Sequence, residues 1–156
     1  IGEVRGCDQY APCSLEEHHP DFFWYGIHGV EPLFTIMGTG CQQVTRVHAE
    51  GQDVIVGLWA GGRIGTCRGL RDSRTGYGST VFGTKAILPG GGFDGYEPLI
   101  VEIVKFFKTG KPPVTAEETI EIYAFMSAAD ESKAQNGAPV SIQELIEKSG
   151  GGKISP

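Results

Sequence analysis

The sequence has no uninterrupted apolar run of the roughly 18 residues at which a membrane-spanning helix would be expected. It also lacks the charged start and short apolar stretch of a secretory signal peptide. We therefore expect no membrane partner and, by default, a cytoplasmic protein. Ile1 does not resemble a natural start, so we expect a piece of a longer protein, whose preceding part could carry an export signal to the periplasm.

Basic charge is scarce. Lys and Arg total 13 against 19 Asp and Glu, which gives a net charge of −6. Nucleic-acid phosphates attract Lys and Arg patches, so we predict no nucleic-acid partner. The one basic cluster is expected to be a solvated strand end and loop, and it comprises Arg63, Arg68, Arg71 and Arg74.

Metal- and nucleotide-binding motifs are absent as well. The four cysteines have no C-x-x-C spacing, and the adjacent His18 and His19 lack the H-E-x-x-H pattern. No metal site is predicted, and the cysteines are expected to be free thiols because the chain can form a core without bridges. No G-x-G-x-x-G turn joins a strand to a helix, so no residue of this chain is predicted to bind a dinucleotide.

The apolar pattern predicts an α+β fold, an open and mostly antiparallel β-sheet with helices packed on one face. Residues 1–149 would form one domain and residues 150–156 a disordered tail. A short strand is possible within residues 1–10, and alternating segments between residues 43 and 88 predict an antiparallel meander. The expected helices cover residues 21–37, 96–109, 116–135 and 141–148. Asp21, Thr115 and Ser141 are the expected N-terminal caps of the first, third and fourth of them.

Gly61-Gly62 fits a two-residue hairpin turn, which would pair Trp59 with Ile64. In that register Ile55, Trp59 and Ile64 share the sheet face opposite the helices. An apolar patch there, extended by polar residues, is typical of a protein contact, so we predict self-association through this face.

His28 is the titratable residue of most interest, because it lies between Gly26 and Gly29. An imidazole there could exchange a proton with a substrate hydroxyl, or it could be a packed or capping histidine. The glycines would let a backbone or a flat ligand approach closely. Trp24 and Tyr25 could stack on a sugar ring, or they could be core aromatics.

Two segments, GIHGVEPLFTIMG at residues 26–38 and the stretch from YEPLIVEIVKFF to AADESK at residues 96–133, resemble the C-terminal domain of Gfo/Idh/MocA oxidoreductases. The resemblance implies a preceding Rossmann domain, absent here, that binds NAD or NADP and supplies a catalytic lysine. It implies His28 as the catalytic histidine and a sugar- or cyclitol-like substrate. The open sheet would form homo-oligomer contacts. Trp24 stands where the family has an aspartate, and Glu31 follows the histidine by three positions.

The sequence therefore predicts the substrate-binding and oligomerisation domain of an NAD(P)-dependent oxidoreductase, with Trp24 and Tyr25 as substrate contacts. The isolated chain is expected to be inactive and to bind no cofactor. Two other functions stay open: a domain of an NAD-dependent glycoside hydrolase, and a non-catalytic dimerisation or binding module.

Overall fold

The computed structural model describes residues 1–91 and 95–150, so the predicted tail lies, except for Gly150, outside the described residues. Within that part of the chain the strands are β1 (Val4–Pro12), β2 (Cys41–Ala49), β3 (Gln52–Trp59), β4 (Arg63–Leu70), β5 (Gly78–Gly83), β6 (Ile87–Gly90) and β7 (Val140–Ser141). The α-helices are α1 (Ile27–Met37), α2 (Glu97–Thr109), α3 (Ala116–Ala134) and α4 (Ile142–Lys148). Two short 3-10 helices, η1 (Asp21–Phe23) and η2 (Ala60–Gly62), complete the list.

The strands form one open sheet in the order β6-β5-β1-β4-β3-β2-β7. Neighbouring strands are antiparallel except β1 and β4, which are parallel, so the predicted open and mostly antiparallel sheet is confirmed. The predicted meander is confirmed only for β2-β3-β4. The expected continuation to residue 88 is wrong, because β1 lies between β4 and β5.

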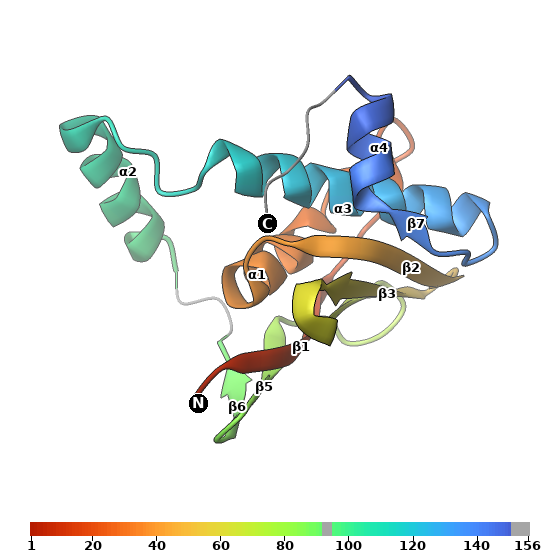
Figure 1. Ribbon diagram of the computed structural model, residues 1–156, viewed down its shortest axis with the longest axis horizontal. Helices are drawn as coiled ribbons and strands as arrows, with labels where there is room; N and C mark the ends of the chain where they lie inside the picture. Colours follow the sequence, from red (N-terminus) through yellow and green to blue (C-terminus); the bar gives the residue numbers. More distant parts are fainter. Residues whose placement is uncertain (92–94, 151–156) are drawn as a thin grey trace.

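Helices cover one face of this sheet (Figure 1). α1 packs on β1 and β4, α3 packs on β2, and α4 packs beside α3. Between the layers, the rings of Phe34, Trp59 and Phe125 lie with centroids 5.5 to 6.0 Å apart. Gly57 and Gly65 leave room for this cluster, because a Cβ at either position would collide with the Trp59 ring. The core therefore lies between the sheet and α1 and α3.

The predicted hairpin register is wrong by one residue. The turn between β3 and β4 has three residues, Ala60–Gly62, so Trp59 pairs with Arg63, and Ile64 pairs with Leu58. Because side chains alternate along a strand, that slip moves the β3 side chains to the other face. Ile55 and Trp59 are buried under the helices, and the Trp59 indole donates to the Gly38 carbonyl over 2.8 Å. Ile64 does lie on the uncovered face, hereafter the open face, and is 51% exposed.

The predicted helix over residues 21–37 is wrong at its start. It divides into η1 and α1, and Gly26, expected inside the helix, is the N-cap residue of α1. Asp21 does not cap a helix, because its carboxylate accepts hydrogen bonds from Arg46 and Lys133 instead. The predicted stop is confirmed: the Gly38 amide donates to the Phe34 carbonyl over 2.7 Å.

The other helices agree closely with the sequence prediction. Thr115 and Ser141 accept hydrogen bonds from the amides of Glu118 and Glu144, as expected of N-terminal caps. In contrast to α3 and α4, α2 contains no buried residue and projects from the body in Figure 1. The four cysteines are free, as predicted, and all four are buried. No helix among the described residues is long and apolar enough to span a bilayer.

Candidate functional site

His28 lies in the first turn of α1 and is open to solvent. Its side chain is 50% exposed, and its Nδ1 atom is 3.6 Å from Oε2 of Glu31, one turn further along. The Tyr25 ring meets the imidazole edge to face at a centroid distance of 5.0 Å. Because Glu31 lies on the Nδ1 side, Nε2 is the nitrogen left for an external hydroxyl. The structure therefore gives His28 an acidic neighbour and an aromatic one.

The two aromatic residues predicted as substrate contacts separate in space. Tyr25 contacts His28, whereas Trp24 packs against His19 at a centroid distance of 5.1 Å. Trp24 and Tyr25 are 48% and 37% exposed, so neither belongs to the core. Tyr25 is thus part of the His28 site, and Trp24 lies beside a different ring.

Tyr77 is a neighbour of Tyr25 that the sequence did not indicate. Burial, a hydrogen bond with Tyr25 and electrostatic repulsion from Tyr25 and Tyr96 raise the pKa of Tyr77 to about 12. The phenol therefore stays protonated at neutral pH and can donate a hydrogen bond. Tyr77 lies far along the chain from Tyr25, and only the completed sheet brings them together, so neither spacing nor motif signals the pair.

The glycines around His28 do not open a path for a ligand, contrary to the sequence interpretation. A Cβ on Gly26 would meet the Phe22 ring, and one on Gly29 would meet the Cys67 sulfur and Ala11. Both glycines therefore let α1 pack closely against η1 and the sheet. Pro32 lies inside α1 and has no N–H, so the His28 carbonyl has no amide partner there.

A groove of about 370 Å³ runs between α1 and α3 next to this site. Glu31 connects the two, because its carboxylate lies near His28 and its side chain also lines the groove. Apolar, hydroxyl and carboxyl side chains form the walls: Ile27, Glu31, Thr35, Val114, Glu118, Thr119, Ile122 and Tyr123. The groove can therefore accept a molecule with both apolar and hydroxyl surfaces.

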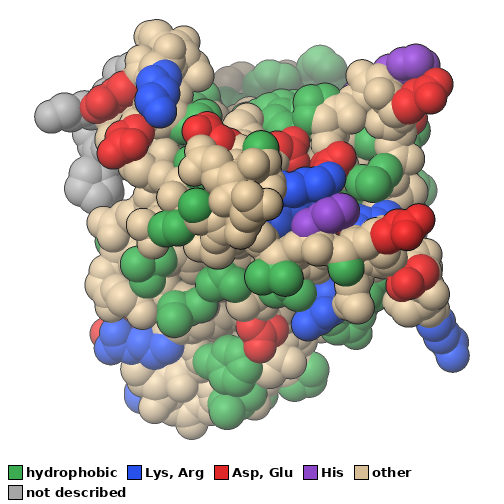
Figure 2. Space-filling model, turned by 90° about the vertical axis from the view of Figure 1, so that its right-hand side faces the viewer, with side chains coloured by type: hydrophobic (Ala, Val, Ile, Leu, Met, Phe, Trp, Pro, Cys, Tyr) green, Lys and Arg blue, Asp and Glu red, His purple; other side chains and the backbone are tan. Residues whose placement is uncertain are grey.

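A second concentration of charge lies at the β2–β3 turn, where Figure 2 shows acidic and basic side chains around a histidine. Arg46 is fully buried at its centre and donates hydrogen bonds of 2.6 to 2.7 Å to Asp21, Asp53 and Asp130. The network contains three acids, Asp21, Asp53 and Asp130, and four basic side chains, Arg46, His48, Arg71 and Lys133. The prediction that Arg71 is solvated is wrong, because it pairs with Asp53 at 2.6 Å. These groups satisfy one another, so the network joins η1, β2, β3 and α3.

The pKa values in this network differ with the number of bases around each acid. Burial alone would raise the pKa of Asp53, but hydrogen bonds from Arg46, Arg71 and His48 hold it below its usual range. For Asp130 burial prevails over its pairing with Arg46 and raises the pKa to about 6. Asp130 is therefore the acid in this network that changes charge nearest neutral pH.

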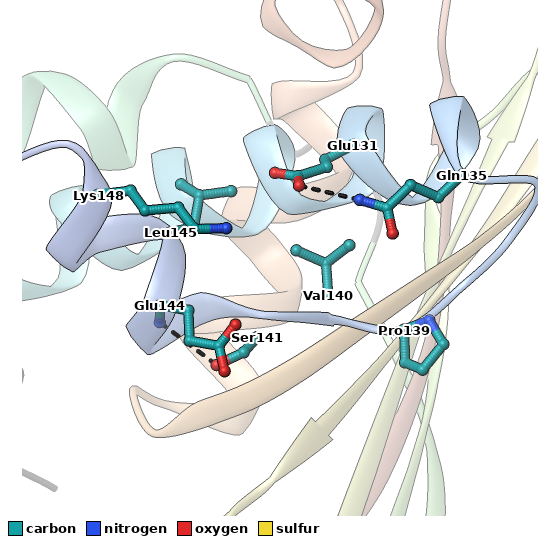
Figure 3. A pocket seen from close by; sticks show the side chains of 8 residues that line it. All are labelled: Glu131, Gln135, Pro139, Val140, Ser141, Glu144, Leu145 and Lys148. Atoms are coloured by element: carbon teal, nitrogen blue, oxygen red, sulfur yellow. Dashed lines mark hydrogen bonds between the residues drawn. The ribbon is translucent and has the colours of Figure 1, made fainter.

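A hollow of about 230 Å³ between the end of α3, β7 and α4 has no such chemistry (Figure 3). Of the residues that line it, Glu131 accepts a hydrogen bond from Gln135, and the backbone amide of Glu144 donates to the Ser141 hydroxyl. The hollow lies at the opposite end of α3 from the His28 groove, and we assign it no role.

The described residues offer no fit to a dinucleotide or a metal ion. The N-terminal amides of α3 and α4 are capped by their own side chains, Thr115 and Ser141, and the glycine-rich turn that would receive a pyrophosphate is absent from the sequence. Residues 1–91 and 95–150 contain no group of three His, Cys, Asp or Glu side chains placed to hold a metal. No reaction step can therefore be assigned to a cofactor held by these residues.

The sequence matches no protein-family model and no curated protein. The fold does match solved structures. With myo-inositol 2-dehydrogenase from Lactobacillus plantarum the TM-score is 0.75 at 15% identity, over 92% of this chain and 58% of that one. With scyllo-inositol dehydrogenase from Lactobacillus casei, solved with NAD(H) and scyllo-inositol, the TM-score is 0.70 at 13% identity, over 91% and 57%.

The chain thus spans less than two thirds of the length of each dehydrogenase that it matches. It has the fold of a domain of these enzymes, and the fold predicted from the Gfo/Idh/MocA resemblance is confirmed. At this level of identity the likeness concerns architecture, so roles for individual residues rest on the geometry of this chain.

Proposed function

We propose that this chain is the substrate-side domain of an NAD(P)-dependent oxidoreductase of the Gfo/Idh/MocA type, which acts on a cyclic polyol or sugar. The observation that carries the proposal is the exposed His28 imidazole, held between Glu31 and Tyr25 in a fold shared with inositol dehydrogenases. The nicotinamide cofactor, which would accept or supply the hydride, belongs to a separate dinucleotide-binding domain. The part of the matched dehydrogenases that this chain does not cover supports such a domain.

In this proposal His28 moves the proton of the reacting hydroxyl. Nε2 takes the proton when the alcohol is oxidised and returns it when the carbonyl is reduced. The Glu31 carboxylate lies 3.6 Å from Nδ1, on the side of the ring away from the reacting hydroxyl. In the family an aspartate stands at the position of Trp24. In this chain Glu31 is the carboxylate beside the histidine.

Tyr25 and Tyr77 fit the remaining hydroxyls of a polyol. Tyr25 contributes to raising the pKa of Tyr77, and the Tyr25 ring lies against His28. A ring-shaped substrate with several hydroxyls can contact an aromatic face and exchange hydrogen bonds with phenols. The named substrates of the matched dehydrogenases, myo- and scyllo-inositol, belong to this class and support it.

The open face of the sheet is proposed to form a contact between copies of the chain. Paired residues form one row across five strands on this face. In order along the row they are Leu58, Ile64, Gly6, Phe82 and Ile87. Ile64, Leu58 and Ile87 are 51%, 39% and 63% exposed. Contiguous apolar area of this kind is normally covered in a soluble protein.

The test is NAD(P)-dependent turnover of cyclic polyols by the complete protein encoded at this gene. His28→Ala should lower turnover by about 10²–10⁴-fold, the usual contribution of a general acid–base group. His18→Ala is the matched control, because the exposed His18 imidazole pairs with its neighbour Glu17 on the surface, and the change should leave turnover unchanged. Equal turnover in wild type and His28→Ala would remove His28 from the mechanism.

A further inference from the structure

α2 is an amphipathic helix that covers nothing in the described molecule. It extends over 13 residues without a buried one, and in Figure 1 it stands away from the sheet and the other helices. Its large apolar side chains are between 38% and 80% exposed: Leu99, Ile100, Val101, Ile103, Val104, Phe106 and Phe107. All but Val101 fall at the spacing of one broad helix face, whereas Glu102, Lys105 and Thr109 follow one another on the other.

Such a helix requires a partner. Isolated helices of about 12–15 residues are marginal in water, because most helical stability comes from packing of the apolar face. The Lys105–Glu102 pair, at 2.6 Å but well exposed, adds little to this. Seven exposed large apolar side chains on one short helix are therefore typical of a covered interface.

The position of α2 relative to the His28 site indicates what covers it. Gly90, at the end of β6, pairs with Ser79, two residues after Tyr77, and α2 begins a few residues after β6, at Glu97. Tyr25, which contacts His28, and Tyr96, the N-cap residue of α2, both contribute to raising the pKa of Tyr77. The start of α2 therefore lies near Tyr77, on the side of the molecule that carries the candidate site. A domain packed along α2 from that end would also lie near His28.

α2 is not part of the open face of the sheet. α1, α3 and α4 lie on one side of the sheet, and Figure 1 shows α2 joined to α3 at the edge of that helix layer. Self-association through the open face would use the opposite side. We therefore treat the open face of the sheet and the apolar face of α2 as separate contact surfaces.

We propose that α2 is the docking element for the dinucleotide-binding domain, with its apolar face packed against that domain. The inference rests on the proposed function, which requires a nicotinamide opposite His28. The matched dehydrogenases have the additional length that such a domain needs, since this chain spans 57% and 58% of theirs. A helix that starts near the candidate site and is clamped by the other domain holds the hydride carrier and His28 at a constant separation.

Hydrogen exchange tests this directly. In the 156-residue chain, α2 amides should exchange at nearly unprotected rates while α3 amides are protected. In the complete protein encoded at the gene, α2 amides should become at least tenfold slower. Phe107→Glu, at a side chain 80% exposed, should leave the melting temperature of the 156-residue chain unchanged but lower that of the complete protein and weaken its NADH affinity at least tenfold.

The matched control is Lys105→Glu on the polar side of α2, which should change neither the melting temperature nor the NADH affinity of the complete protein. If α2 stays unprotected in a complete protein that still binds NADH and turns over substrate, the docking inference is wrong and the proposed function stands. If the complete protein binds no NADH, the proposed function fails, and the inference fails with it. Concentration-dependent protection of α2 in the 156-residue chain alone would assign the surface to a second copy and overturn the inference.

Discussion

Asp53 Oδ1 accepts a hydrogen bond of 2.7 Å from Nε of Arg46, and neither side chain is exposed to solvent. Removing one partner leaves the other as an uncompensated buried charge. We expect Asp53→Ala to lower the free energy of unfolding by about 3–5 kcal/mol, measured by urea denaturation. Asp8→Ala is the control, because the exposed Asp8 carboxylate on the open face accepts a hydrogen bond from the Thr66 hydroxyl, and its loss should cost less than about 1 kcal/mol. Equal losses for both would contradict a stabilising network.

Asp130 should make stability depend on pH in an unusual direction. Its folded pKa is about 6, above the ordinary value of 3.8, so the folded state favours the protonated form. The contribution of protonated Asp130 to the free energy of unfolding is complete when the pH is below the ordinary pKa of 3.8, and it is lost as the pH rises through about 6. Asp130→Asn mimics the protonated form, so the variant should gain stability relative to wild type between about pH 5 and about pH 7.5. Chemical denaturation at both pH values measures this, and a relative loss over that interval would refute it.

Glu121 is buried on α3, where its Oε1 accepts hydrogen bonds from the amides of Gly40 and Cys41 over 2.7 and 2.6 Å. Burial raises its pKa, and its Oε2 is the one buried side-chain N or O atom without a partner among the described residues. Glu121→Gln keeps an acceptor for both amides and removes the charge, so it should not lower the thermal stability at neutral pH. Glu121→Ala leaves two amides unsatisfied and should cost about 1–3 kcal/mol. The interpretation fails if Gln costs as much as Ala.

Self-association should depend on Ile64. A glutamate there would place a charge in the proposed contact, so Ile64→Glu should shift the sedimentation of the chain toward monomer at micromolar concentration. Ile120→Glu makes the same chemical change at equal exposure, 52% against 51%, but on α3 and away from the open face. It should leave the sedimentation unchanged. A wild-type chain that is monomeric at every soluble concentration would exclude this contact.

Local signals predicted the helices well and the sheet register poorly. The Thr115 and Ser141 caps and the Gly38 and Gly110 stops are short-range features, and the helices end within one or two residues of the predicted positions. The β3–β4 turn depends on a single residue. Ala60 joins the two glycines in the turn, and this moves Trp59 from the predicted open face into the core.

The candidate site was predictable only in its local part. His28 and Glu31 lie one turn apart on α1 and Tyr25 just precedes that helix, so their neighbourhood follows from sequence spacing. The long-range partners could not be predicted: Tyr77 reaches Tyr25 only through the folded sheet, and the acids around Arg46 come from distant segments. Asp21 is a residue type that often caps helices, but here its carboxylate accepts hydrogen bonds from Arg46 and Lys133 instead.

The central position of β1 determines how this sheet can assemble. Gly6 pairs with Ile64 on one side and with Phe82 on the other. Both strands that flank β1 therefore come from segments much later in the sequence. Contacts between residues so far apart in sequence carry a large loop-closure cost and slow the search for the native arrangement. The β2-β3-β4 meander can form early from adjacent segments, whereas the sheet stays in two halves until the first strand enters the gap between β4 and β5. Insertion of that strand is therefore the step expected to limit the folding rate.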